Sequence, residues 1–268
     1  MILILASRWD TTAQDLAAAW ADQPVRVMTA RDLSRAGWCQ RLGTQDVTIG
    51  RNAATCPDAT IRPHPAVSSD IAIRHDRAVI HGQPIANEEI QGVLTRLPWV
   101  TDTELPEIVA PDRAYVAAEM SAFLLFWLSG LTCPVLNEPT PTCLSGPGWR
   151  PERWTRAAAE TGMTVRALQR DSRVKGAPAD SAPSTSVTVV GSQVYGEVHP
   201  DLKQRARLLA ELAHVSLLTV RFSGAERGAA FLGADPSPSL DHHSVRAAVL
   251  EHLTGSASIR SSASCIRP

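Results

Sequence analysis

The stretch Gly92-Val93-Leu94-Thr95-Arg96 gives the first indication of the fold class. It is a short apolar run that ends on a polar residue, which is typical of a buried strand. A second apolar run, Ile2 to Leu5, is followed by Asp10 and by the apolar positions of a short helix. Val25 to Met28 then forms a further apolar run. Buried strands that alternate with helices are typical of a parallel sheet, so we expect an α/β fold.

A long helix is the clearest element downstream of this strand. Asp112 follows a proline, the apolar body runs from Ala114 to Ser129, and Gly130 comes directly after it. This pattern predicts a helix with Asp112 as its N-cap and a glycine stop. A short strand and an amphipathic helix are predicted next, at residues 135–137 and 151–161, with Trp154, Ala157 and Ala158 facing inward.

The remaining segments predict an insertion, a linker and a smaller C-terminal unit. Short alternating stretches between residues 44 and 88 favour a partly antiparallel insertion with a turn at His81-Gly82. Residues 171–186 are polar and proline-rich, as in a linker. Beyond them the patterns predict a hairpin at 187–196, a helix at 201–213, strands at 217–222 and 229–232, and a helix at 244–253.

Composition argues against several classes of partner. The 268 residues carry a net charge of −1 with a pI of about 6.7, which gives no footprint for nucleic acid or a membrane surface. The first six residues are too few for a signal peptide and the longest apolar run, 122–128, is too short to span a bilayer, so we expect a cytoplasmic protein. The five cysteines include no CxxC pair and predict neither a disulfide framework nor a metal site.

The order of these segments resembles the ATP-grasp superfamily. Residues 93–98, 112–119, 135–139 and 149–165 are similar to the pre-ATP-grasp region of glutathione-synthetase-like and ribosomal-S6-modification-like ligases, including those that link peptides. Residues 187–191, 208–213 and 231–238 resemble the later strand, helix and closing strand of that family. The resemblance implies an α/β fold in which a pre-ATP-grasp-like parallel sheet layer is joined to a smaller C-terminal α+β unit.

The same resemblance implies a division of the chain. Residues 1–166 would form the pre-ATP-grasp-like domain, and residues 167–186 a linker in place of the nucleotide-clamping domain. Residues 187–255 would be the remnant of the ATP-grasp core, and residues 256–268 a disordered tail.

Departures from the family pattern point to a truncated, degenerate member. The family's clamping domain supplies two strand lysines that hold the nucleotide phosphates, whereas Lys175 is the only lysine between residues 163 and 186 here. The family's closing strand carries a glutamate and an asparagine that hold Mg²⁺, and the matching positions here are Gly233 and Asp235. A single carboxylate cannot bridge two ions, so charge neutralisation in phosphoryl transfer would be poor. Arg150 also stands where a lysine is usual.

The resemblance also implies candidate substrate-binding residues. Arg96 at a strand end and Glu119 on the long helix match positions that face the family's substrate cleft, and an arginine fork suits a carboxylate. The alternative is a structural Arg96–Glu119 pair. The set is completed by Tyr115, one helical turn before Glu119, and by Asn137, at the end of a short strand. The alternative role of Tyr115 is packing. The nearest approach to a metal-ligand cluster is Asp235 with His242 and His243, which could equally cap a helix.

These features predict a non-catalytic binding or partner subunit, a pseudoenzyme that acts on a peptide or carboxylate substrate. Its partner would be a peptide or a protein, with a homo- or hetero-oligomer as one form of that interaction, and no cofactor is expected. One alternative is a minimal active ATP-dependent carboxylate–amine ligase, which would use ATP and Mg²⁺. Another is a subunit whose active site is completed by a second chain.

Overall fold

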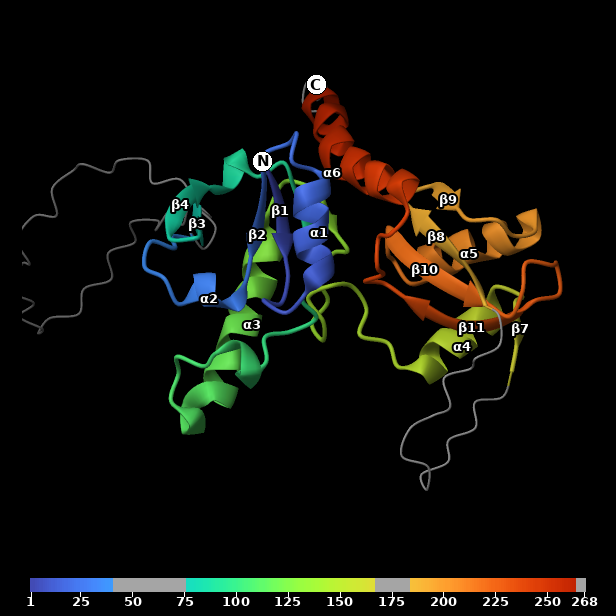
Figure 1. The fold of residues 1–268 in the computed structure, drawn as a ribbon, viewed down its shortest axis with the longest axis horizontal. Helices are drawn as coiled ribbons and strands as arrows, with labels where there is room; N and C mark the ends of the chain where they lie inside the picture. The colour runs from blue at the N-terminus through green and yellow to red at the C-terminus, as the bar shows by residue number, and fades with distance from the viewer. Residues whose placement is uncertain (41–75, 167–183, 264–268) are drawn as a thin grey trace, which may run out of the picture.

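The computed structural model describes residues 1–40, 76–166 and 184–263, with side chains up to residue 255. The chain forms two halves, each built on its own sheet, and helix α6 (His243–Ala263) extends from the second half to the first (Figure 1). The first sheet has four parallel strands in the order β2-β1-β5-β6. They are β1 (Ile2–Leu5), β2 (Val25–Met28), β5 (Gly92–Thr95) and β6 (Val135–Leu136). The predicted parallel α/β sheet is confirmed.

Helices cover both faces of the first sheet, which is why β1 is apolar at every position. Leu3 and Leu5 point to the core formed with α3 (Arg113–Gly130). Ile2 and Ile4 point to the opposite core, formed with α1 (Thr11–Ala19) and α6. No helix in the described part of the chain is apolar over a length that could cross a membrane.

A hairpin flanks this sheet beside the short helix α2 (Ala30–Leu33). Its strands β3 (Arg77–Ile80) and β4 (Gln83–Ala86) are antiparallel and are joined by His81 and Gly82, both with positive φ (52° and 77°). This conformation is typical of a two-residue hairpin turn. The turn predicted at His81-Gly82 is therefore confirmed, while the part of the predicted insertion before residue 76 lies outside the described residues.

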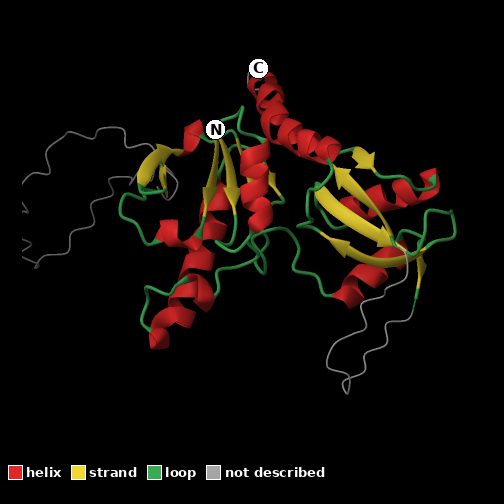
Figure 2. Ribbon diagram, viewed as in Figure 1, coloured by secondary structure: helices red, strands yellow, loops and turns green. Residues whose placement is uncertain are grey.

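The second sheet has five strands in the order β7-β11-β10-β8-β9, antiparallel except for the β7–β11 pair. Helices α4 and α5 pack on one face, and α4 buries Trp154, Ala157 and Ala158 as predicted (Figure 2). We call the opposite side the open face. The elements of this half are β7 (Thr164–Val165), β8 (Thr185–Val190), β9 (Gln193–Tyr195), β10 (Leu217–Phe222), β11 (Ala230–Asp235), α4 (Pro151–Glu160) and α5 (Pro200–Leu212).

Three features differ from the sequence predictions. The side chain of Asp112 does not cap α3, because this residue is itself helical (φ −96°, ψ −12°) and closes a 3₁₀ turn, Ala110–Asp112. Helix α6 continues through Ala263, beyond its predicted end at Leu253, so part of the tail predicted as disordered is helical. Both α4 and β7, which the predicted division assigns to residues 1–166, pack with the second sheet because the buried side chains of α4 face it.

Candidate functional site at the junction of the two sheets

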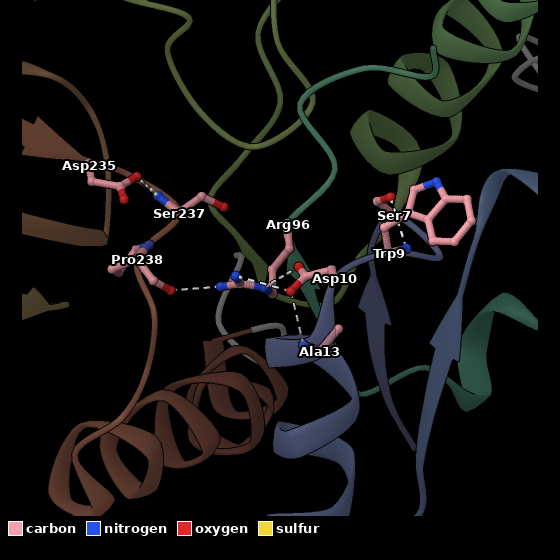
Figure 3. A network of polar contacts seen from close by, with 8 residues as sticks. All are labelled: Ser7, Trp9, Asp10, Ala13, Arg96, Asp235, Ser237 and Pro238. Carbon is pink, nitrogen blue, oxygen red and sulfur yellow. Dashed lines mark hydrogen bonds and ion pairs between the residues drawn. The ribbon is translucent and has the colours of Figure 1, made fainter. Parts of the chain in front are cut away.

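Arg96 lies where β5 ends, at the carboxyl edge of the first sheet, as predicted. Its Nε donates to Oδ2 of Asp10 at 2.7 Å, and the two side chains are only 9% and 14% exposed. Asp10 also accepts from the backbone N–H of Ala13 and so caps α1. Figure 3 shows the Arg96 guanidinium between this carboxylate and the backbone of Pro238. The charge of Arg96 is thus matched from within the chain.

The predicted neighbour of Arg96 is not the observed one. Arg96 and Glu119 were predicted either to bind substrate or to form a structural pair, and neither prediction included Asp10. Glu119 lies exposed on α3. Tyr115 is 69% exposed on the same helix. The reason is topological, because α1 starts at the edge where β5 ends whereas the exposed side of α3 faces away from the sheet. The structure therefore brings neither Tyr115 nor Glu119 to Arg96.

The segment that follows β11 closes over this edge of the first sheet. The carbonyl of Pro238 accepts from Nη1 of Arg96 at 2.7 Å, and the carbonyl of Pro236 accepts from Nδ2 of Asn137 at 2.8 Å. In open α/β sheets this edge is where ligands usually bind. Here Arg96 and Asn137, the two polar residues that the sequence predicted at this edge, donate to backbone carbonyls of the same chain.

Asn137 is 1% exposed and joins the two sheets. Its Oδ1 accepts from the N–H groups of Ser216 and Leu217, and its Nδ2 donates to the carbonyl of Leu217 as well as to that of Pro236. Its own carbonyl accepts from the hydroxyl of Thr95. Asn137 follows β6 of the first sheet, and all the partners of its side chain belong to the second half. The side chain therefore bridges the two halves.

The three residues singled out as metal ligands do not form a metal-binding group. Asp235 accepts from the N–H of Ser237 at 2.8 Å, which makes a local turn (Figure 3). His242 and His243 are exposed at the start of α6. Across the residues that the structure describes, no three His, Cys, Asp or Glu side chains gather closely enough to hold a metal ion.

A large hollow of about 960 Å³ lies on the open face of the second sheet. Hydroxyl groups of β8 and β10 form its floor, where Thr188 and Thr219 are 2.7 Å apart. Lys203 and Arg221 bring positive charge, whereas Glu197, Asp235 and Asp241 bring negative charge. The site is polar and of mixed charge, so it suits a ligand with hydrogen-bonding groups better than a polyanion.

Two smaller hollows follow in a row, so that the second hollow lies beside the large one and the third beside the second. One of about 440 Å³ shares Arg221, Ala234 and Asp235 with the large hollow, and its walls are mostly aromatic, proline and glycine residues. The other, about 600 Å³, shares Pro147, Gly148 and Trp149 with the second and includes Arg150 and Arg153. We call the three together the trough. Cys143, on the wall of the second hollow, is buried.

Sequence reasoning missed Arg221, which lines two of the three hollows. A signal was present, because the pattern Leu218, Val220, Phe222 alternates on β10 and places Thr219 and Arg221 on the other face. What alternation could not show is which strands lie beside β10. The pairing of Arg221 with Gly233 depends on the register between β10 and β11.

No protein-family model matches the sequence, and no curated protein matches it either. Solved structures do match. The macrocyclase MdnC from Microcystis aeruginosa MRC, bound with the precursor peptide MdnA, is 11% identical with a TM-score of 0.62, over 96% of this chain and 100% of that chain. A RiPP-associated ATP-grasp ligase from Chryseobacterium gregarium, in complex with ADP and a leader and core peptide, is 10% identical with a TM-score of 0.59, over 95% and 96% of the two chains.

A third match is the ATP-grasp ligase PsnB, complexed with a phosphomimetic variant of its minimal precursor, Mg and ADP. It is 14% identical with a TM-score of 0.57, over 94% of this chain and 98% of that chain. Likeness at such low identity is a likeness of fold. This chain therefore has an ATP-grasp-like fold, of the kind seen in peptide-modifying ligases.

Proposed function

We propose that the chain is a peptide-binding protein built on an ATP-grasp-like framework that does not itself catalyse ATP-dependent ligation. The observation that carries the proposal is the composition of β11. At the two positions where the resemblance implies metal-binding side chains, the strand has Gly233 and Asp235. Asp235 is exposed and accepts from Ser237 in a local turn, which leaves no pair of ligands to bridge two ions.

The distribution of lysine supports the same proposal. In the described residues the only lysine is Lys203, and it lies on helix α5. The resemblance implies lysines on strands, directed at the nucleotide phosphates. The large hollow instead has one lysine, on a helix, together with three carboxylates. The negative charges of these carboxylates would repel a triphosphate.

Peptide as the partner is supported by the solved structures of similar fold. MdnC, the Chryseobacterium gregarium ligase and PsnB were each crystallised with a precursor or with leader and core peptide. The residues that line the trough extend from the start of α6, over the open face of the second sheet, to the start of α4, and an extended peptide segment would follow this course. In this role the chain would be a binding or partner subunit.

A second candidate function is a minimal carboxylate–amine ligase that uses ATP and Mg²⁺. It is favoured by the size of the large hollow and by the presence of Asp235, Asp241 and Lys203 among its lining residues. Completion of the site by another chain would be a variant of this candidate.

Calorimetric titration of the purified chain with Mg-ATP separates the candidates. We expect no tight binding and no nucleotide turnover, either in the unaltered chain or in Asp235→Ala, and a melting temperature that Asp235→Ala leaves nearly unchanged because the side chain is exposed. Tight binding of Mg-ATP, or turnover that Asp235→Ala abolishes, would support the ligase and overturn the proposal. Turnover only after addition of a second chain would support the shared site.

A further inference from the structure

Arg221 is a cation on the open face of the second sheet. Its neighbours on β10, Val220 and Phe222, are buried against α4 and α5, so the side chain of Arg221 is directed to the other face and is exposed. In the sheet register it stands opposite Gly233 of β11. A Cβ atom added to Gly233 would lie 3.2 Å from Nη2 of Arg221. The guanidinium therefore lies across β11, in the space that a side chain at position 233 would fill.

The positive charge of Arg221 is not compensated within the described part of the chain. It forms no hydrogen bond and no ion pair there, unlike Arg96, which is held by Asp10, and Arg205, which is held by Asp201. The nearest carboxylate along β11, that of Asp235, instead accepts from Ser237. A guanidinium with all its donors available is ready to bind an anion, and its planar fork fits both oxygens of a carboxylate.

The second hollow of the trough gives the surroundings of this cation. Beside Arg221 its walls include Pro98, Trp149 and Phe231, and Trp99, which is 54% exposed. Exposed aromatic surface of this kind is stabilised when it is covered by an apolar side chain. Its 440 Å³ could accommodate one bulky side chain, with the guanidinium at one end.

Charge restricts the kind of anion. The large hollow on the other side of Arg221 contains three carboxylates and two cations, so a triphosphate would meet net repulsion there. Towards α4 the third hollow contains Arg150, Glu152 and Arg153, a balance of one positive charge, and the Arg153 guanidinium lies over the Trp149 ring at 4.2 Å. A mostly apolar hollow with Arg221 at one end and groups of mixed charge on both sides fits a peptide better than a nucleotide.

We infer that Arg221 is the carboxylate-binding residue of the trough, and that the trough takes a peptide segment in which an acidic residue is next to an aromatic or bulky aliphatic residue. The carboxylate would pair with the guanidinium over Gly233, and the apolar side chain would lie against Trp99 and Trp149. This inference rests on the proposed function, because it specifies the class of peptide that the chain binds.

Short synthetic peptides of Gly and Ser with a central Glu-Phe, Gln-Phe or Glu-Ala pair test the inference by fluorescence anisotropy with the full chain. We expect Glu-Phe to bind most tightly and loss of either group to weaken it. Arg221→Ala should raise the Kd for Glu-Phe by about tenfold to a hundredfold, which is typical when a charge-assisted hydrogen bond is lost. Arg156→Ala is the matched control, since Arg156 is an exposed arginine of α4 outside the trough.

Gly233→Glu provides an independent variant that keeps Arg221. Its carboxylate would lie against the guanidinium and neutralise it, so binding of Glu-Phe should fall as in Arg221→Ala, with the circular dichroism spectrum unchanged. If Arg221→Ala does not fold, this variant alone decides. Equal binding of Glu-Phe and Gln-Phe, or equal Kd values in Gly233→Glu and the unaltered chain, overturns the inference.

The experiment separates failure of the inference from failure of the proposed function. Peptide binding that is insensitive to Arg221 and Gly233 would remove the inference alone. Competition of magnesium-free ATP with the Glu-Phe peptide would show that Arg221 binds phosphate, and this result would also overturn the inference. Tight Mg-ATP binding with turnover would instead overturn the proposed function.

Discussion

The Arg96–Asp10 pair shows how a residue can be placed correctly by sequence and still have the wrong partner. The strand end at Arg96 follows from local pattern, but Asp10 is 86 residues away along the chain. Both side chains are largely buried, and Arg96 also donates to Pro238. Removing one partner of such a pair costs more than the pair contributes, because the other charge stays buried alone.

We predict that Arg96→Ala lowers the free energy of unfolding by about 3 kcal/mol, near the lower end of the range for a broken buried pair. Urea denaturation followed by circular dichroism measures it. The double variant Asp10→Ser/Arg96→Ala should recover part of the loss, since serine still caps α1 and carries no charge. A stability equal to that of the unaltered chain, together with weaker peptide binding, would instead make Arg96 a binding residue.

His252 on α6 is a single residue whose protonation should make the stability of the fold depend on pH. Burial lowers the pKa of this imidazole, since the charged form is the one that loses hydration. Its ring lies close to Gly191 in the turn between β8 and β9, where a Cβ on Gly191 would be 3.0 Å from Nδ1. The folded state thus favours the neutral ring more than the unfolded state does.

From this we predict that the chain loses stability as the pH falls below about 6.5, the ordinary value for histidine. Below that value the unfolded state binds the proton first, so stability is full above it and declines until the lowered folded-state pKa is passed. Melting temperatures between pH 8 and pH 5 measure the effect. His252→Gln should flatten the profile, whereas His242→Gln, at an exposed position, should leave it as it is.

At the scale of elements, the close crossing of α6 over β5 fixes the two halves together. Gly92 starts β5, and a Cβ at this position would lie 2.7 Å from the carbonyl oxygen of Leu253. Real Cβ atoms do not approach a backbone oxygen so closely, so the helix lies where it does because residue 92 has no side chain. The C-terminal helix therefore requires a glycine at position 92 in order to pack against β5.

Gly92→Ala is expected to destabilise the chain by about 1–3 kcal/mol, the usual cost of overpacking, because a helix backbone must shift. Gly130→Ala is the matched control. That glycine is the last residue of α3, and a Cβ added there would meet no atom of the described residues within 4 Å beyond its chain neighbours and its own helix backbone, so alanine should leave stability equal or slightly higher. Chemical denaturation of both variants decides, and equal stability of the two would contradict the close-contact explanation.

At the scale of the whole molecule, Asn137 links the two sheets through four side-chain hydrogen bonds. Its position before the loop to α4 places it between the carboxyl edge of the first sheet and the start of β10. The apolar core around α6 joins the same halves, since it contains Leu136 of the first sheet and Leu217 of the second. Because polar and apolar contacts both join the two sheets, we expect the two halves to unfold as one cooperative unit.

We predict that Asn137→Ala destabilises the chain by roughly 3 kcal/mol or more, since several buried backbone groups would lose their partners at about 1–3 kcal/mol each. Differential scanning calorimetry should show one transition for the unaltered chain and a broader or split transition for the variant. Asn137→Asp keeps the acceptor for Ser216 and Leu217 but loses both donated bonds, so it should also destabilise. A single sharp transition at the unaltered temperature would refute the bridging role.

The sequence by itself determined the elements and the fold class. The apolar run from Ile2 to Leu5 predicted a strand buried on both faces, and the stripe of Trp154, Ala157 and Ala158 predicted a helix packed on one side, as the structure shows. The boundaries of β1, β2 and β10 agree with the predicted ones. These features follow from periodicity, which is a property of neighbouring residues and needs no knowledge of distant ones.

Only the tertiary structure decided which polar groups meet. That Arg96 meets Asp10, that Asn137 bridges to Leu217 and that Arg221 lies over Gly233 all depend on the order and register of strands. Those are set by the packing of whole elements, after chain closure over long separations, and periodicity carries no record of them. The sequence could therefore name residues with the right chemistry, while the assembled sheets decided which of them face the trough.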